Sequence, residues 1–167
     1  MDWIATRAYC LGLTGMFLNV KGREASGTVT PGAEATRLKA EIVGKLNGLR
    51  DVERNEVGIR EVFDTATLYS GPYLENAPDL LIGYNAGYRT SWDCATGVIE
   101  GPVFEYNVKA WSGDHCIDPR LVPGVLFCNR KIEAQDPALI DIAPTALRLF
   151  GVEPPPYMDG RPLAVAT

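Results

Sequence analysis

Apolar residues along the chain form short runs that are separated by glycine, proline and polar residues. The run over residues 9–20 is interrupted by glycine, and we expect one buried strand there. Residues 57–63 and 79–84 predict two further strands; the second is a short apolar run between turn signals, which is typical of a strand buried on both faces. A fourth buried strand is expected over residues 122–128.

Helical periodicity follows the first of these runs. Apolar side chains recur at the spacing of one helix face at Leu38, Ile42, Leu46 and Leu49. We expect this helix to begin with Thr30 as its N-cap and Pro31 at its first position, where the missing N–H costs no hydrogen bond. Gly44 and Gly48 each lower the helix propensity by about 1 kcal/mol relative to alanine.

A second helix is expected to begin at Asp141, to hold Pro144 in its first turn and to end at Gly151. Residues 85–101 are rich in glycine, polar residues and aromatics, and predict a long functional or connecting loop. Residues 153–167 are proline-rich and predict an extended tail; we expect residues 154–163 to pack across a sheet edge. Strands that alternate with helices indicate an α/β layered sheet.

Composition and charge narrow the function classes. The chain has 167 residues, of which 46% are hydrophobic, enough to build the core of one domain. The net charge is -5 with the two signs interspersed, and the basic stripe of a protein that binds nucleic-acid grooves is missing. The N-terminal residues do not resemble a signal peptide and no apolar run is long enough to span a bilayer, so we expect a soluble, cytoplasmic protein with no membrane partner.

Four cysteines are scattered along the chain, at Cys10, Cys94, Cys116 and Cys128. No two form a CxxC pair, which argues against a zinc ribbon and against a thioredoxin-type site. A domain of this size does not need disulfides to fold, so we expect reduced thiols.

The only histidine, His115, lies in a loop between Asp114 and Cys116. Histidine is a common metal ligand and proton carrier, but a single one needs several carboxylates beside it, and a lone loop histidine is more often structural or solvated. A Ser/His/Asp triad lacks the Gly-x-Ser-x-Gly turn that would expose its serine. Cys116 next to His115 is a weak candidate for a catalytic cysteine–histidine pair, because the two members of such a pair normally come from distant parts of a chain.

A second candidate site follows the first apolar run. Lys21 and Arg23 lie on one face if the strand continues, and Gly22 between them allows close approach of a ligand to the backbone. With Asn19 beside them they could bind an anion such as phosphate. A solvated strand end is the alternative interpretation of this segment.

Several strings of the chain resemble the alkaline phosphatase superfamily. His115 is followed after a short loop by Val122-Pro123 and an expected strand, as is the last metal-ligand histidine of that superfamily, with a spacing a few residues longer than in its mutases. The ending resembles that of its sulfatases and phosphodiesterases, in the strings Asp141-Ile142-Ala143-Pro144-Thr145, Leu149-Phe150-Gly151-Val152, Pro155-Pro156 and Met158-Asp159-Gly160-Arg161-Pro162-Leu163.

The N-terminal half narrows the resemblance to one branch. The relevant strings are Thr6-Arg7-Ala8-Tyr9-Cys10-Leu11-Gly12-Leu13, Phe17-Leu18-Asn19-Val20-Lys21-Gly22-Arg23-Glu24, Gly71-Pro72-Tyr73 and Ala77-Pro78-Asp79-Leu80. They are similar to the predicted phosphohydrolase/phosphomutase branch, which is grouped with type I phosphodiesterases and nucleotide pyrophosphatases. The resemblance covers nearly the whole chain.

The resemblance implies a metal-dependent phosphoric ester hydrolase. Such enzymes hold two divalent ions, zinc or manganese, on aspartates and histidines, and attack phosphorus with a metal-activated Thr or Ser. Only His115 carries over as a metal ligand, because the family's Asp-His-Gly motif and nucleophile have no counterpart in this sequence. We assign no catalytic residue, and expect Asn19, Lys21 and Arg23 to contact the substrate phosphate.

These observations predict that residues 1–167 are a single domain or a fragment, the C-terminal part of an alkaline-phosphatase-like layered sheet flanked by helices. The partner would be a small phosphate ester, and the chain alone would be inactive. Two other hypotheses stay open: a stand-alone, non-catalytic domain that binds a ligand or partner, and one half of a split enzyme. A missing N-terminal half, or a homo-oligomer, would cover the strand edges left open.

Overall fold

The computed structural model describes residues 2–98, 100–111, 113 and 116–165, apart from the side chains of Ala95 and Thr96. The chain divides into two compact units, Met1–Pro123 and Gly124–Thr167. We call them unit 1 and unit 2 and describe each by itself. His115, the predicted metal ligand, lies outside the described residues.

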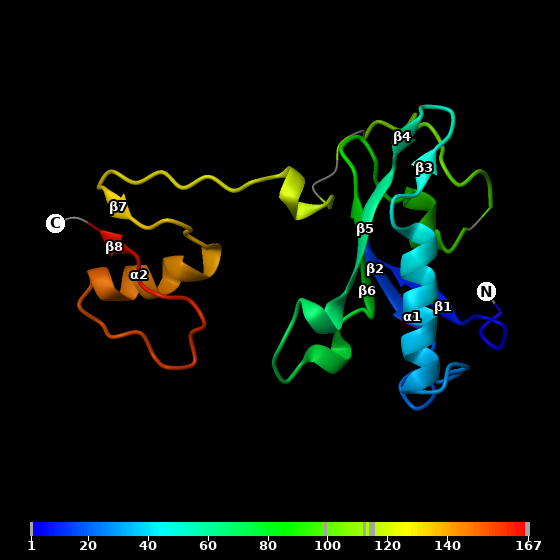
Figure 1. Ribbon diagram of the computed structural model, residues 1–167, viewed down its shortest axis with the longest axis horizontal. Helices are drawn as coiled ribbons and strands as arrows, with labels where there is room; N and C mark the ends of the chain where they lie inside the picture. Colours follow the sequence, from blue (N-terminus) through cyan, green and yellow to red (C-terminus); the bar gives the residue numbers. More distant parts are fainter. Residues whose placement is uncertain (1, 99, 112, 114–115, 166–167) are drawn as a thin grey trace. The chain divides into compact units, whose positions relative to one another are not determined.

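Unit 1 is built on an antiparallel sheet of β1 (Ala8–Leu11), β2 (Gly15–Leu18), β6 (Leu80–Tyr84) and β5 (Ile59–Asp64), paired in that order. Figure 1 shows α1 (Ala33–Leu46) lying across one face of this sheet. The prediction of a mixed α/β protein is confirmed at this level; every strand pair described in the sheet is antiparallel.

Shorter elements connect the main ones in unit 1. Two short strands, β3 (Arg50–Asp51) and β4 (Glu56–Val57), pair with each other beyond the end of α1. Single turns of 3-10 helix are η1 (Thr65–Thr67) and η2 (Leu74–Asn76) between β5 and β6, then η3 (Trp92–Thr96) and η4 (Pro119–Leu121). In the described part of the predicted long loop over residues 85–101, η3 is the one regular element.

The prediction of one strand over residues 9–20 is wrong, because this run forms the β1–β2 hairpin. Gly12 has φ of 77°, a left-handed conformation that turns the chain and that glycine adopts without strain. Tyr9 then pairs with Phe17 across the hairpin, and their rings stack with centroids 5.5 Å apart. Apolar residues recur on both sides of Gly12 because both strands of the hairpin have a packed side.

The predicted apolar face of the first helix is confirmed. Leu38 packs with Leu18 and Val29 in one cluster. Ile42, Leu46 and Leu49 pack against a second cluster, which consists of Ile59, Val62, Leu80 and Ile82. The four periodic residues thus hold α1 and the residues just after it to the sheet.

The predicted start of this helix is wrong by two residues. Gly32, with φ of 86°, is the N-cap, and no side chain caps the helix there. Glu34 in the first turn instead accepts a hydrogen bond from the backbone N–H of Thr30 at 3.0 Å. Thr30 and Pro31 therefore form a turn that leads into the helix.

Unit 2 contains η5 (Leu139–Asp141), α2 (Ile142–Leu149) and a pair of short strands, β7 (Ile132–Glu133) and β8 (Ala164–Val165). Asp141 is the N-cap of α2 as predicted, and Gly151, with φ of 72°, follows its end. The Asp141 carboxylate accepts hydrogen bonds from the N–H groups of Ala138 (3.0 Å) and Arg161 (2.8 Å), and not from the helix itself.

The tail of the chain packs on the start of α2. Leu163 N–H donates to Thr145 Oγ1 at 2.8 Å, beside the bond from Arg161 to Asp141. A Cβ atom added at Gly160 would lie 2.0 Å from the Ile140 carbonyl oxygen, so only glycine allows the two backbones to approach this closely. The expected packing of residues 154–163 across a sheet edge is replaced by these contacts with η5 and α2.

The strand predicted over residues 122–128 is also wrong. The segment begins after η4 and carries no ladder pairing in the described part of the chain. Pro123 has no N–H to contribute to a ladder, and Phe127 is 89% exposed. The boundary between the two units falls inside this segment.

Within the described residues, no helix combines the length and the apolar character that crossing a membrane requires.

Candidate functional site

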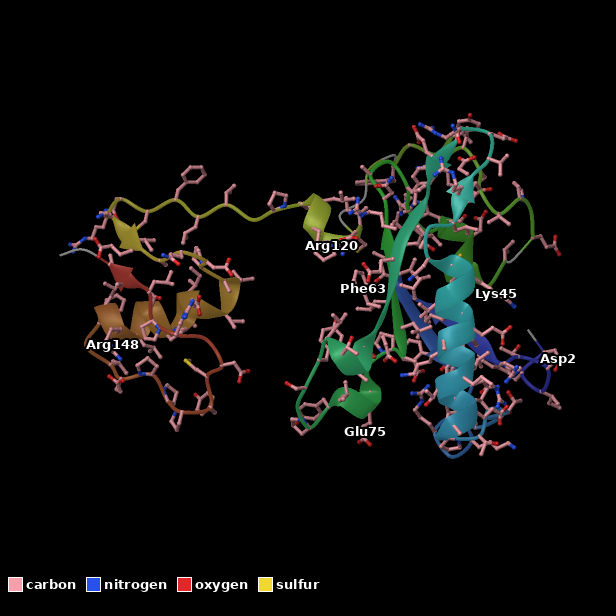
Figure 2. All side chains as sticks on the ribbon, in the orientation of Figure 1. Asp2, Lys45, Phe63, Glu75, Arg120 and Arg148 are labelled. Carbon is pink, nitrogen blue, oxygen red and sulfur yellow. The ribbon has the colours of Figure 1, made fainter. Side chains whose placement is uncertain are left out.

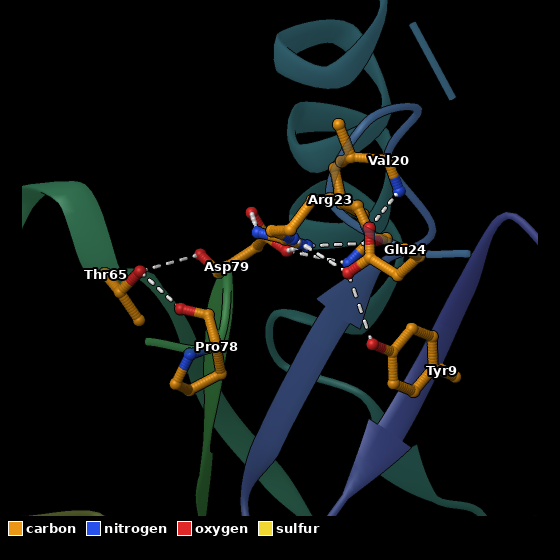
Figure 3. A network of polar contacts seen from close by, with 8 residues as sticks. Tyr9, Val20, Arg23, Glu24, Thr65, Pro78 and Asp79 are labelled. Atoms are coloured by element: carbon orange, nitrogen blue, oxygen red, sulfur yellow. Dashed lines mark hydrogen bonds and ion pairs between the residues drawn. The ribbon is translucent and has the colours of Figure 1, made fainter. Parts of the chain in front are cut away.

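Arg23, one of the predicted phosphate contacts, is bound to the protein itself (Figure 3). Its guanidinium donates to both carboxylate oxygens of Asp79, with Nη2–Oδ2 at 2.6 Å and Nη1–Oδ1 at 3.2 Å. Nη2 also donates to the Leu18 carbonyl oxygen at 2.7 Å, and Nε to Glu24 Oε1 at 2.8 Å. The Asp79 carboxylate raises the pKa of Arg23 above its ordinary value.

The two carboxylates around Arg23 are bound to the backbone as well. Asp79 Oδ2 accepts from the N–H of Leu18 at 2.7 Å, and Glu24 Oε2 accepts from the N–H of Val20 at 2.7 Å. The hydroxyl of Tyr9 donates to Glu24 Oε1 at 3.3 Å, and burial together with this carboxylate raises the pKa of Tyr9. These bonds connect the hairpin, the loop after it and the start of β6 into one polar network.

Asn19, the second predicted contact, is buried, with 1% of its surface exposed. Its Nδ2 lies within hydrogen-bond distance of the carbonyl oxygens of Trp3 (3.0 Å), Thr6 (2.9 Å) and Ser26 (3.0 Å). The side chain thus holds the N-terminal turn against the loop that follows β2. Its amide group faces this backbone cluster.

Lys21, the third predicted contact, is exposed. Its backbone pairs with the loop, since Lys21 N–H donates to the Val29 carbonyl oxygen at 2.8 Å. In the described part of the chain its ammonium group has no ion pair. The structure therefore brings Asn19, Lys21 and Arg23 onto one loop, with only the Lys21 head group directed to solvent.

Asp118, three positions after His115, is a fully buried carboxylate with 0% of its surface exposed. Arg120 binds it through Nε–Oδ1 at 2.9 Å and Nη2–Oδ2 at 2.5 Å, and Arg60 adds Nε–Oδ2 at 3.2 Å. The bonds from Arg120 and Arg60 lower the pKa of Asp118 to about 2. The Asp118 N–H donates to the Tyr84 carbonyl oxygen at 3.0 Å, at the end of β6.

Arg120 itself is fixed from three sides. Besides Asp118 it binds Glu61 Oε2 at 2.7 Å, and its guanidinium lies 5.3 Å from the centroid of the Phe63 ring. Figure 2 labels Arg120 and Phe63. Because Glu61 and Phe63 belong to β5, Arg120 holds the chain just after Asp118 against this strand.

A cleft of about 560 Å³ in unit 1 lies between the β3–β4 pair and the loop that contains η3. Aromatic side chains of this loop line it: Tyr88, Trp92, Phe104 and Tyr106. Arg89 lies 4.4 Å from the centroid of the Trp92 ring. The Tyr88 hydroxyl lies within hydrogen-bond distance of Asp51 Oδ2 and Glu56 Oε2, each at 3.1 Å. Burial and these two carboxylates raise the pKa of Tyr88 to about 12.

A smaller cleft of about 310 Å³ borders the polar network. Arg23, Lys39, Thr65 and Asp79 contribute to its wall. The Lys39 ammonium pairs with Asp64 Oδ2 at 2.6 Å, as Arg23 does with Asp79. Both of these cationic side chains in the wall therefore form ion pairs with carboxylates.

The described residues do not by themselves fit a two-metal centre. Among them no three His, Cys, Asp or Glu side chains converge as ligands, and a divalent transition metal in a protein is normally held by at least three. No step is therefore derived through a metal ion. The predicted role of His115 stays a prediction.

The sequence patterns did not single out the most strongly bound carboxylates, Asp79 and Asp118. Each has a signal in the sequence: Asp79 comes directly before a buried strand, and Asp118 comes directly before a proline. Such a residue needs a cation or several N–H groups when the fold covers it.

Comparison of the chain with models of protein families, with curated proteins and with solved structures finds no match.

Proposed function

We propose that this chain is part of a metal-dependent phosphoric ester hydrolase of the phosphodiesterase and nucleotide pyrophosphatase type, within the alkaline phosphatase superfamily. The observation that carries the proposal is the ordered succession of strings from His115 through Val122-Pro123 to the ending at residues 158–163. Composition agrees with it, since the acidic chain has no basic stripe for nucleic-acid grooves.

The anchoring of the chain on both sides of His115 supports a ligand role for this residue. On one side, Arg89 Nη1 donates to the Gly113 carbonyl oxygen at 3.0 Å. On the other, Asp118 is buried and bound by Arg120, Arg60 and the end of β6. A metal ligand works best when neighbouring contacts fix the backbone that carries it.

Lys21 is the residue of the loop after β2 that we propose to contact the substrate phosphate. Its ammonium group is directed to solvent, whereas Arg23 and Asn19 are engaged in the fold. In this proposal Arg23 and Asn19 position Lys21 by holding the loop. The nucleophile and the other metal ligands would come from polypeptide outside residues 1–167, and these residues alone would not hydrolyse phosphate esters.

The test begins with the native protein isolated from its source, whose intact mass is compared with 18.2 kDa. In the complete enzyme, His115→Ala should lower hydrolysis of bis(4-nitrophenyl) phosphate in the presence of zinc or manganese at least 100-fold, and should lower the bound metal. Cys116→Ser, one position away, is the matched control and should keep both. If His115→Ala keeps its turnover and its metal content, the proposal is wrong.

A second candidate function is a non-catalytic domain that binds a ligand. The cleft of about 560 Å³ with its aromatic wall favours it, because binding sites for small molecules are typically apolar clefts of this size with a few polar groups. This candidate predicts a monomer that unfolds cooperatively with the same midpoint with and without a chelator. Aggregation of residues 1–167 in the absence of a partner polypeptide would contradict it.

A further inference from the structure

Two cysteines that are far apart in the sequence lie on elements that contact each other. Cys10 belongs to β1 and Cys94 to η3, and Cα atoms of these two elements approach within 8 Å. Neither cysteine is in a disulfide. Both residues are exposed, and the surrounding protein partly buries the Cys10 thiol. A disulfide requires Cα atoms no more than about 7 Å apart, and the contact between β1 and η3 brings residues of the two elements near this range.

The direction of the Cys10 side chain follows from the hairpin. Cys10 pairs with Met16, and Met16 packs against the core cluster beneath α1. Since neighbouring residues of a strand point to opposite faces, Tyr9 and Phe17 occupy the other face, where their rings stack. Cys10 is therefore on the face of the sheet that α1 covers.

The electrostatics of Cys10 agrees with the contact between the two elements. The pKa of the Cys10 thiol is raised, first by burial of the group and then by the charge of Cys94. Such an effect of one thiolate on another falls off with distance. The effect therefore agrees with a short separation of the two side chains.

We propose that Cys10 and Cys94 form a reversible disulfide that joins the β1–β2 hairpin to the wall of the larger cleft. Cys94 and Trp92 both line this cleft. The disulfide would fix η3, and with it the Trp92 side of the cleft, to the sheet. In the reduced protein the loop around η3 is held by weaker contacts, among them the ion pair between Lys109 and Asp93 at 2.8 Å.

The oxidant in this reaction is a low-molecular-weight disulfide such as glutathione disulfide. One cysteine thiolate attacks a sulfur of glutathione disulfide and releases one glutathione thiolate, which leaves a mixed disulfide on the protein. The second cysteine loses its proton, attacks the protein sulfur of the mixed disulfide and releases the second glutathione thiolate. Two protein thiols are oxidised and one glutathione disulfide is reduced to two glutathione molecules.

The experiment uses residues 1–167 with no substitution. The protein is incubated with glutathione disulfide, the remaining thiols are alkylated, and tryptic peptides are analysed by mass spectrometry. Trypsin places each of the four cysteines in a separate peptide; Cys10 lies in residues 8–21 and Cys94 in residues 90–109. We expect these two peptides to be linked, and the link to disappear after reduction.

Two comparisons make the result specific. Oxidation in urea should spread the links over all cysteine pairs, while the folded protein should give mainly the link between Cys10 and Cys94. Cys94→Ser should abolish the link and Cys128→Ser should keep it. Oxidation should raise the unfolding midpoint by roughly 5–15 °C in the unaltered chain, and not in Cys94→Ser.

Absence of the linked peptide from the folded protein, together with its presence after oxidation in urea, would overturn the proposal. So would a folded protein in which Cys10 pairs with Cys116 as often as with Cys94. Both outcomes are read from the unaltered chain, so they do not depend on the folding of a variant.

Discussion

Asp118 contributes to the acid stability of unit 1. Its pKa is lowered from 3.8 to about 2 in the folded protein, so its contribution to the free energy of unfolding is fully present above about pH 4 and is lost as the pH falls through 2. We expect this contribution to be roughly 1–2 kcal/mol, because Arg120 is 53% exposed and water screens its charge.

Urea unfolding of the wild type and of Asp118→Asn between pH 5 and pH 2 tests this expectation. The variant should be less stable at pH 5, and the difference should shrink toward pH 2 as the wild-type carboxylate is protonated. Asp93→Asn, which alters an exposed ion pair with Lys109, is the control and should change the midpoint little at any pH. A difference for Asp118→Asn that stays constant down to pH 2 would contradict the assignment.

Gly27 is required by close backbone packing in the loop after β2. A Cβ atom added there would lie 2.3 Å from the Val20 carbonyl oxygen and 2.6 Å from the Lys21 Cα atom, so the backbone would have to move. We expect Gly27→Ala to lower the free energy of unfolding by about 2–4 kcal/mol. Gly44→Ala is the control, because the added Cβ atom has open space on α1. It should raise the free energy of unfolding by about 0.5–1 kcal/mol. Urea unfolding in which both substitutions change stability in the same direction would contradict this prediction.

For the candidate site, residue types alone predicted the position of the polar side chains but not their partners. A lysine, an arginine and an asparagine after a strand are typical of an anion site, and their position on one loop was predictable. Their partners were not, because Asp79 lies far along the sequence from Arg23 and reaches it only through the pairing of β2 with β6. Burial of Asn19 depends in the same way on the N-terminal turn, whose carbonyl oxygens it binds.

At the scale of elements, Arg23 connects β2 to β6 through side-chain bonds in addition to the ladder. Arg23→Lys keeps the charge but cannot bind both oxygens of Asp79 and the Leu18 carbonyl oxygen at once. We expect a loss of about 1–3 kcal/mol in the free energy of unfolding. Arg37→Lys on the exposed side of α1 is the matched control and should change the free energy of unfolding by less than about 0.5 kcal/mol. Equal losses of stability in Arg23→Lys and Arg37→Lys, measured by urea unfolding, would contradict the role of the network.

Periodicity predicted the first helix, because burial of one face selects a helix, and a short apolar run between turn signals predicted the strand over residues 79–84. The α1 face from Leu38 to Leu49 and the strand at β6 are confirmed for this reason. Apolar content alone misled twice. It could not show that residues 9–20 turn back at Gly12, and residues 122–128 are apolar but have no ladder partner in the part of the chain described.

At the scale of the whole molecule, the boundary between the units is an exposed segment. Phe127 is 89% exposed and lies in a stretch without ladder pairing, whereas Phe17 and Phe63 belong to paired strands. We expect limited chymotrypsin digestion to cut first near Phe127, because proteases need locally extended, unpaired backbone. Phe127→Ala should delay that cut, and a first cut within the sheet of unit 1 would contradict the division.

The contacts that complete unit 2 have a consequence for the order in which the protein is made. The Asp141 carboxylate and the Thr145 hydroxyl bind the N–H groups of Arg161 and Leu163, and β7 finds its partner in β8. A ribosome adds residues from the N-terminus onward, so the sheet of unit 1 has all its strands once β6 has emerged. Unit 2 must wait until residues 161–165 leave the exit tunnel. A chain stalled shortly after α2 would present its helix to chaperones and proteases before the bonds to Arg161 and Leu163 can form.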